Sequence, residues 1–106
     1  MFDKKMVGLF KKPKRHLKKL LEAGEYDEAV AFGKNLESEY SDDADFMFIM
    51  GSVYFIVDDA KRALPYFEKA YASKSEDLNT MIALKEIYVR KNMMDKANAI
   101  KAKLGQ

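Results

Sequence analysis

A spacing of 34 residues recurs along this chain of 106 residues and constrains its fold more than any other feature. At this spacing a large residue, a small residue and a turn-forming residue each return in one register without gaps. The three series are Leu20, Tyr54 and Tyr88; Ala29, Ala63 and Ala97; and Gly24, Asp58 and Asn92. A fixed period of this length is typical of proteins that stack copies of one supersecondary unit. The chain is therefore expected to contain three such units.

Each 34-residue block predicts two helices, because its apolar residues recur at intervals of three, four and seven. The turn-forming residue of each block separates the two helical patterns. The six apolar faces expected to pack are Leu17, Leu20 and Leu21; Tyr26, Ala29, Val30, Leu36 and Tyr40; Met47, Met50, Tyr54 and Val57; Ala60, Ala63, Leu64, Phe67, Ala70 and Tyr71; Leu78, Met81, Leu84, Ile87 and Tyr88; and Met94, Ala97, Ile100 and Leu104. The helices should meet near residues 24, 41, 58, 75 and 92, and no β-sheet is expected.

Acidic residues mark the expected helix starts. Ser41-Asp42-Asp43 precedes the first helix of the second block, and Ser75-Glu76-Asp77 precedes that of the third. Within the second block, Asp58 or Asp59 can accept a hydrogen bond from a backbone N–H group of the following helix. Carboxylates also suit the positive end of a helix dipole. These acids are therefore interpreted as helix caps.

The residues of the second block read Met47-x2-Met50-Gly51-x2-Tyr54 and then Ala63-x3-Phe67-x2-Ala70. This pattern resembles the tetratricopeptide repeat, with Met in place of the usual Trp and Leu. The small residues Gly51 and Ala63 suit a close approach of two paired helices. The rings of Tyr54 and Phe67 suit the space between neighbouring hairpins.

The resemblance implies an all-α superhelix, a solenoid of three helical hairpins, over nearly the whole chain. The repeats are expected at residues 10–43, 44–77 and 78–106, after a basic segment at residues 1–9. The outer repeats depart from the family pattern at Pro13, His16 and Gly33, and at Lys85 and Lys101. Such departures are expected of terminal repeats, which must present one polar face to water.

The resemblance also implies a binding surface. In this family the first helix of each repeat lines a concave groove, with five of its positions facing inwards. On this chain these positions are Lys11, Lys14, Lys18, Leu21 and Glu22 in the first repeat; Asp45, Phe48, Ser52, Phe55 and Ile56 in the second; and Asn79, Ile82, Glu86, Val89 and Arg90 in the third. The expected groove has an apolar floor and a basic edge. The expected function is that of an interaction module or adaptor that binds a segment of another protein there.

One helix leaves an alternative open. The stretch Phe46–Val57 is apolar almost all round, which is more apolar surface than the packing of one hairpin needs. The excess at Phe48, Phe55 and Ile56 either contacts a partner or is covered by the N-terminal segment or a second copy of the chain. The alternative function is a self-assembling scaffold whose groove or end faces mediate homo-oligomerisation.

One known mode of the family is absent. Some members bind the acidic C-termini of heat-shock chaperones through a clamp of two lysines, two asparagines and one arginine. Lys14 can match the first clamp lysine, whereas the other four positions hold Lys18, Ile49, Asn79 and Ala83. A chaperone C-terminus is therefore not the expected partner.

The N-terminal residues 1–19 carry a local excess of positive charge. They hold eight Lys and Arg residues against Asp3, a net charge of +7, so residues 20–106 carry −5 of the overall +2. Phe2, Met6, Leu9 and Phe10 share one helical face among these lysines. Residues 1–19 suggest a third, weaker function, contact with an anionic membrane or a nucleic acid. Packing on the first repeat, or no order at all, is the alternative.

No catalytic, cofactor or metal signature stands out in the sequence. The chain has no cysteine and one histidine, His16, which the register places toward the core as a packed imidazole. Its five glycines form no phosphate-binding loop. The longest apolar run is too short to cross a bilayer, and no secretory signal is evident. A non-enzymatic, cytoplasmic protein without a cofactor or metal is expected.

Overall fold

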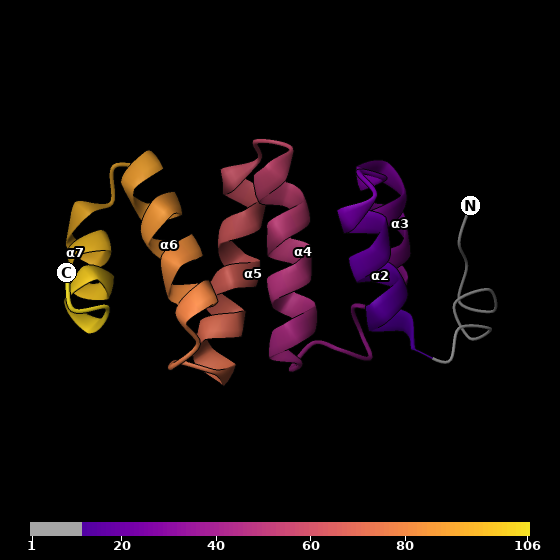
Figure 1. Ribbon diagram of the computed structural model, residues 1–106, viewed down its shortest axis with the longest axis horizontal. Helices are drawn as coiled ribbons and strands as arrows, with labels where there is room; N and C mark the ends of the chain where they lie inside the picture. Colours follow the sequence, from indigo (N-terminus) through magenta and orange to yellow (C-terminus); the bar gives the residue numbers. More distant parts are fainter. Residues whose placement is uncertain (1–11) are drawn as a thin grey trace.

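The computed structural model describes residues 12–106, and all its regular structure there is helical (Figure 1). The helices are α2 (Pro13–Glu22), α3 (Tyr26–Leu36), α4 (Ala44–Ile56), α5 (Ala60–Ser73), α6 (Leu78–Arg90) and α7 (Met94–Lys103). No strand occurs within this range. The predictions of six helices, of their meeting points and of an all-α fold are confirmed for these residues. The predictions for segment 1–9 and for Lys11 lie outside the described residues.

The helices pack in three sequential pairs that stand side by side along the long axis of the molecule (Figure 1). The described chain measures 44 × 24 × 20 Å, so it is about twice as long as it is wide. The first pair contacts the second through α4, which touches both α2 and α3. The second pair contacts the third where α5 meets α6. Each pair therefore contacts its chain neighbours in turn.

The first helix of each pair ends in the same hydrogen-bonded turn. Gly24, Asp58 and Asn92 each take a left-handed backbone conformation, with φ of 78°, 64° and 56°. The residue after each of them donates its N–H to a carbonyl five positions back, as in a Schellman motif. These bonds run from Glu25 to Leu20 (2.9 Å), from Asp59 to Tyr54 (2.9 Å) and from Met93 to Tyr88 (2.7 Å). In every pair, one turn thus contains a residue of the Leu20, Tyr54 and Tyr88 series and a residue of the Gly24, Asp58 and Asn92 series.

Three aspartates cap helices as the sequence predicts. A carboxylate oxygen of Asp43 accepts the Phe46 N–H (2.9 Å), and Asp77 accepts the Thr80 N–H (3.0 Å). Between α4 and α5, Asp59 accepts the Arg62 N–H (3.0 Å), whereas Asp58 occupies the left-handed position. Of the two candidate caps in this turn, Asp59 is therefore the one that caps α5.

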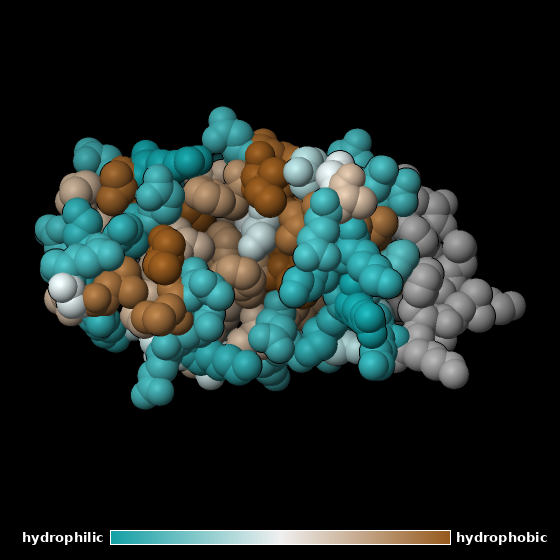
Figure 2. Space-filling model, viewed as in Figure 1, coloured by the Kyte–Doolittle hydropathy of each residue, from teal (hydrophilic) through white to brown (hydrophobic). Residues whose placement is uncertain are grey.

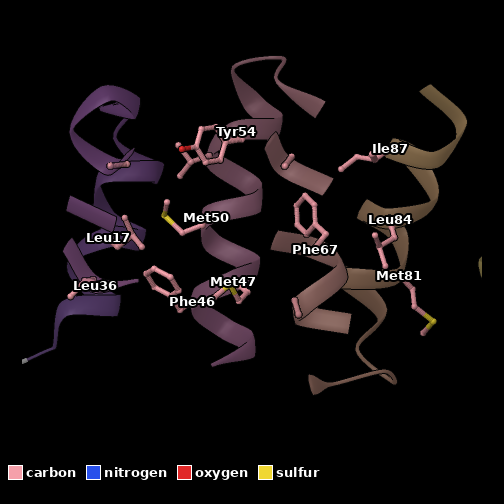
Figure 3. Packing of buried hydrophobic residues seen from close by; sticks show 14 of the residues in the cluster. Leu17, Leu36, Phe46, Met47, Met50, Tyr54, Phe67, Met81, Leu84 and Ile87 are labelled. Carbon is pink, nitrogen blue, oxygen red and sulfur yellow. The ribbon is translucent and has the colours of Figure 1, made fainter. Parts of the chain in front are cut away.

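Figure 3 shows the buried side chains of Leu17, Met50 and Phe67, and each of them lies against a glycine. In the middle pair, a Cβ added to Gly51 would lie 3.0 Å from the Phe67 ring, so the bare backbone admits that ring. At the equivalent positions of the first pair, Leu17 faces Gly33, with Leu17 Cδ1 3.6 Å from a Cβ built there. A Cβ at Gly33 would also overlap Met50 Sδ of the next pair. Gly33 thus admits a side chain from each of two helices.

Some residues of the predicted faces are exposed instead. Val57, Leu78 and Met94 lie in solvent, with Leu78 60% exposed. Val57 follows the last residue of α4, while Leu78 and Met94 are the first residues of α6 and α7. At the end of a helix a side chain has no adjacent helical turn on one side to cover it. The apolar periodicity therefore overestimates the burial of residues at these positions. Conversely, the predicted faces omitted three hydrophobic residues that are fully buried, namely Phe32, Phe46 and Val53.

The expected packing of His16 is confirmed. Its imidazole meets the Phe32 ring edge-on, with ring centroids 4.7 Å apart. Phe32 precedes Gly33 in α3 and is fully buried.

Truncation of the central ring tests the packing. Phe67→Ala should lower the free energy of unfolding by about 3–5 kcal/mol, because Phe67 is fully buried and its removal leaves a cavity. Ala63→Leu should cost about 1–3 kcal/mol by overpacking a buried position. The exposed Leu78→Ala is the control and should stay within about 0.5 kcal/mol. Urea denaturation measures all three, and equal stabilities would show that this interior is not the core.

The repeated turn can be tested separately. Nothing lies within 4 Å of a Cβ built on Gly24, so Gly24→Ala should cost about 1 kcal/mol through backbone strain alone. Asp58→Gly and Asn92→Gly should each gain about 0.5–1 kcal/mol, because they relieve the same strain. Thermal denaturation followed by circular dichroism gives the order of stability. A Gly24→Ala variant as stable as the parent would contradict the left-handed turn.

Candidate functional site

A groove crosses the first helix of every pair and holds about half of the predicted site residues. It encloses about 530 Å³ between α2, α4 and α6, and we call it the α2/α4/α6 groove. The predicted residues that line it are Lys14, Lys18, Asp45, Phe48, Ser52 and Asn79, together with Leu21. The other described residues of the prediction do not line it. Ile82 lies in the first half of α6, and the rest lie toward the C-terminal ends of α2, α4 and α6, namely Glu22, Phe55, Ile56, Glu86, Val89 and Arg90.

The apolar floor of this groove is partly covered by the chain itself. The rings of Phe48 and Phe55 both meet the Phe67 ring of α5 edge-on, with centroids 5.5 and 6.4 Å apart. These two phenylalanines are half-buried, so α5 covers part of the apolar excess that the sequence left unassigned. The remainder lies outside the lining of the groove, where Ile56, Ile82 and Val89 are 52%, 50% and 41% exposed.

Apolar and polar side chains separate on this face. In Figure 2, brown side chains gather near the turn between α4 and α5 and over α6, and teal side chains cover α2. The basic end of the groove thus lies on the first pair and its apolar end on the other two.

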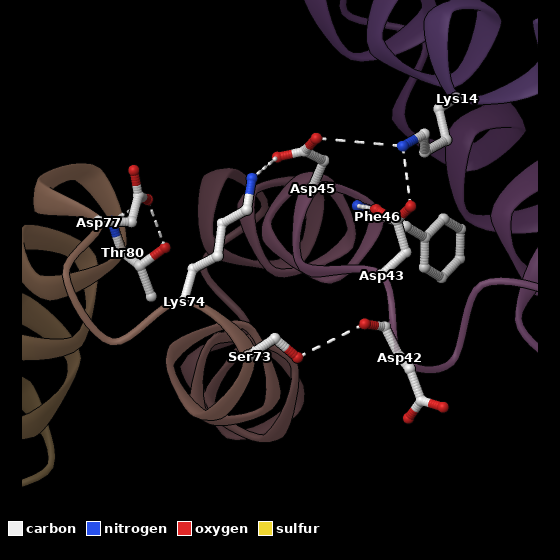
Figure 4. A network of polar contacts seen from close by, with 9 residues as sticks. All are labelled: Lys14, Asp42, Asp43, Asp45, Phe46, Ser73, Lys74, Asp77 and Thr80. Carbon is white, nitrogen blue, oxygen red and sulfur yellow. Dashed lines mark hydrogen bonds and ion pairs between the residues drawn. The ribbon is translucent and has the colours of Figure 1, made fainter.

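An ion-pair network closes the basic end of the groove (Figure 4). Lys14 Nζ of α2 lies 2.8 Å from a carboxylate oxygen of Asp43 and 3.9 Å from one of Asp45. The other carboxylate oxygen of Asp45 lies 3.6 Å from Lys74 Nζ, beyond the end of α5. Arg15 and Lys18 form no ion pair with another residue in the described part of the chain. The charge of Lys14 is therefore engaged within the fold, and Arg15 and Lys18 supply the available positive charge.

The Lys14–Asp43 contact changes the pKa of both groups. The hydrogen bond to Asp43 raises the pKa of the Lys14 ammonium, against the opposing effect of burial. Burial raises the pKa of the Asp43 carboxyl, but the hydrogen bonds from Lys14 and from the Phe46 N–H outweigh it and hold that pKa below its usual value. Asp43 therefore stays ionised at neutral pH and joins α2 to the start of α4.

Arg90 orders the other end of the groove. Its guanidinium lies over the Phe55 ring, 4.5 Å from the centroid. It also approaches carboxylate oxygens of Asp58 (3.6 Å) and Glu86 (3.9 Å). Phe55 is thus held between Phe67 and Arg90, and the cation restricts the ring that borders the exposed apolar surface.

A second groove lies on the other side of α4, and the sequence did not predict it. It encloses about 840 Å³ between α3 and α5, with Met47 and Tyr54 of α4 at its floor, and we call it the α3/α5 groove. Tyr66 stacks on Tyr54, with centroids 5.6 Å apart, and donates its hydroxyl hydrogen bond to the Glu37 carboxylate. Burial, and then this hydrogen bond, raise the pKa of the Tyr66 hydroxyl. The signal available in the sequence was the spacing of Lys61, Pro65 and Lys69 along one helix face.

Residues 12–106 contain neither a metal-binding cluster nor a membrane-spanning helix. No group of three or more His, Cys, Asp or Glu side chains in this range is placed to hold a metal ion. No helix among the described ones combines the length and apolar content that crossing a membrane requires. Comparison of the chain with protein-family models, with curated proteins and with solved structures finds no match.

The network predicts a pH dependence of stability. Because the pKa of Asp43 is lower in the folded than in the unfolded chain, its contribution is present above the unfolded pKa and is lost as the pH falls through the folded value. Asp43→Asn keeps a capping oxygen but no titrating charge. The fall in stability between about pH 5 and pH 3 should therefore be shallower in Asp43→Asn than in the parent. Urea denaturation across this range measures both slopes, and equal slopes would contradict the assignment.

Proposed function

We propose that the chain is a solenoid of three tetratricopeptide-type hairpins that binds a segment of another protein in the α2/α4/α6 groove. One observation carries the proposal: a groove spans all three pairs, Arg15 and Lys18 line it without an ion pair in residues 12–106, and α4 and α6 also carry exposed apolar side chains. The repeated turn and the 34-residue register support the repeat class. The function is that of an interaction module without a catalytic step.

The chemistry of the groove defines the segment. Exposed Ile56, Ile82 and Val89 call for apolar side chains, and Arg15 and Lys18 call for carboxylates. Burying the exposed halves of three aliphatic side chains contributes roughly 3 kcal/mol. A micromolar complex requires about 8 kcal/mol, so charge and backbone contacts along the groove must supply the rest. The expected partner segment therefore spans the groove from α6 to α2.

A second copy of the chain is the alternative occupant. The same exposed apolar side chains, with Leu78 beside them on α6, favour burial against any complementary surface, including an identical one. Sedimentation velocity over a range of concentrations separates the two functions. A monomer at every concentration supports the binding of another protein, and a stable dimer supports self-assembly. The third hypothesis, membrane or nucleic-acid contact through residues 1–19, rests largely on residues outside the described range.

Substitutions on α6 test the apolar end. Ile82→Glu and Val89→Glu should each weaken binding of a partner, recovered by capture with the intact chain, at least tenfold (about 1.4 kcal/mol). Both side chains are exposed, so neither change should disturb folding, unlike changes at Phe48 or Phe55. The matched control Met94→Glu adds the same charge to an exposed apolar position on α7. Calorimetry measures the affinities. An equal loss of affinity in the two α6 variants and in the control would show that the partner binds elsewhere.

The basic end should act mainly on the rate of association. Arg15→Ser and Lys18→Ser should slow association and reduce its dependence on salt, because exposed charges steer encounter and are screened by ions. Lys14→Ser should instead lower stability, since that ammonium is engaged by Asp43 and Asp45. Surface plasmon resonance at two salt concentrations measures the rates. Unchanged association in both variants would remove the basic end from the site.

A further inference from the structure

The α3/α5 groove has a wall with an ordered face. Lys61, Pro65 and Lys69 lie four residues apart on α5, and Arg62 and Tyr66 form the adjacent row. Because residues four apart share one face of a helix, all five side chains border the same space. On the opposite wall, α3 and the residues after it contribute Lys34 and Glu37, among others.

The charges along this groove are predominantly positive and largely unpaired. Four cations line it, namely Lys34, Lys61, Arg62 and Lys69, against one acid, Glu37. Arg62 pairs with Asp59, the cap of its own helix (2.6 Å). Lys34, Lys61 and Lys69 form no ion pair within residues 12–106. The carboxylate of Glu37 is already engaged by the Tyr66 hydroxyl. Three lysines without an ion pair in the described range thus line the groove, against the single negative charge of Glu37.

The floor favours a peptide over a nucleic acid. Proteins that bind single-stranded nucleic acids present aromatic faces on which bases stack. Here Tyr54 and Tyr66 stack on each other, and Tyr54 is only 6% exposed. The floor therefore offers no pair of open aromatic faces on which bases could stack.

We propose that the α3/α5 groove is a second binding site, which takes an acidic segment of a partner protein. Its lysines bind the carboxylates, and the exposed ring of Pro65 contacts a side chain between them. The site is separate from the α2/α4/α6 groove, because α4 lies between the two and presents different residues to each. It does not depend on the function proposed for that groove.

The experiment uses the whole chain and a defined probe. The probe is a fluorescein-labelled peptide of glutamate and leucine, and its binding is followed by fluorescence anisotropy at low salt. Lys34→Glu/Lys69→Glu reverses two charges in the groove and should weaken binding at least tenfold. Lys91→Glu/Lys96→Glu reverses two exposed charges at the far end of the molecule and should change binding less than twofold. Circular dichroism should show the same helicity in both variants.

A gain of affinity provides an independent arm. Glu37→Gln removes the only acid among the described residues that line the groove. It keeps an acceptor for the Tyr66 hydroxyl, so it should tighten binding about threefold. Arg15→Glu/Lys18→Glu reports on the other groove and should leave the affinity of this probe within twofold of the parent.

Three results would overturn the proposal. The first is that Lys34→Glu/Lys69→Glu and Lys91→Glu/Lys96→Glu weaken peptide binding equally, which would indicate attraction by net charge alone. The second is loss of binding in Arg15→Glu/Lys18→Glu in place of Lys34→Glu/Lys69→Glu, which would place the peptide in the α2/α4/α6 groove. The third is that single-stranded oligothymidylate binds more tightly than the peptide and loses its affinity in Lys34→Glu/Lys69→Glu. This result would indicate a nucleic-acid site.

Discussion

The Phe67 ring holds the middle of the molecule together. It fits against the bare backbone of Gly51, which fixes how closely α4 and α5 approach. The same ring supports the edges of Phe48 and Phe55, and these border the α2/α4/α6 groove and its apolar end. On the other side of the pair, α4 and α5 form the floor and one wall of the α3/α5 groove. Both grooves therefore depend on the contact of the Phe67 ring with Gly51. Because α4 is packed on several sides at this central position, its residues are apolar nearly all round.

Sequence patterns predicted the parts of this structure that local physics determines. The three left-handed turns at Gly24, Asp58 and Asn92 share one backbone geometry, so a simple count of residues located them. The caps at Asp43 and Asp77 followed from the preference of helix starts for short acceptors. Periodicity also gave most of the buried faces, because a helix presents every third or fourth residue to its neighbour.

What the sequence left undetermined depends on contacts between helices. Periodicity identifies a lysine on a helix face, but it does not show that Asp43 and Asp45 of another pair engage Lys14. The α3/α5 groove escaped prediction for the same reason: its walls come from two different pairs. Gly33 read as a lost phenylalanine, whereas the structure shows its space shared by Leu17 and Met50.

The contact between Gly33 and Met50 also makes the packing of the first pair against the second sensitive to oxidation of the unfolded chain. Met50 is fully buried, and its sulfur occupies space that could not accept even a Cβ on the facing glycine. A sulfoxide oxygen is polar and needs both room and a hydrogen-bond donor, and this apolar contact offers neither room nor a facing side chain. The folded chain protects this thioether from oxidants. A chain oxidised at Met50 before folding would be unable to close the first pair onto the second.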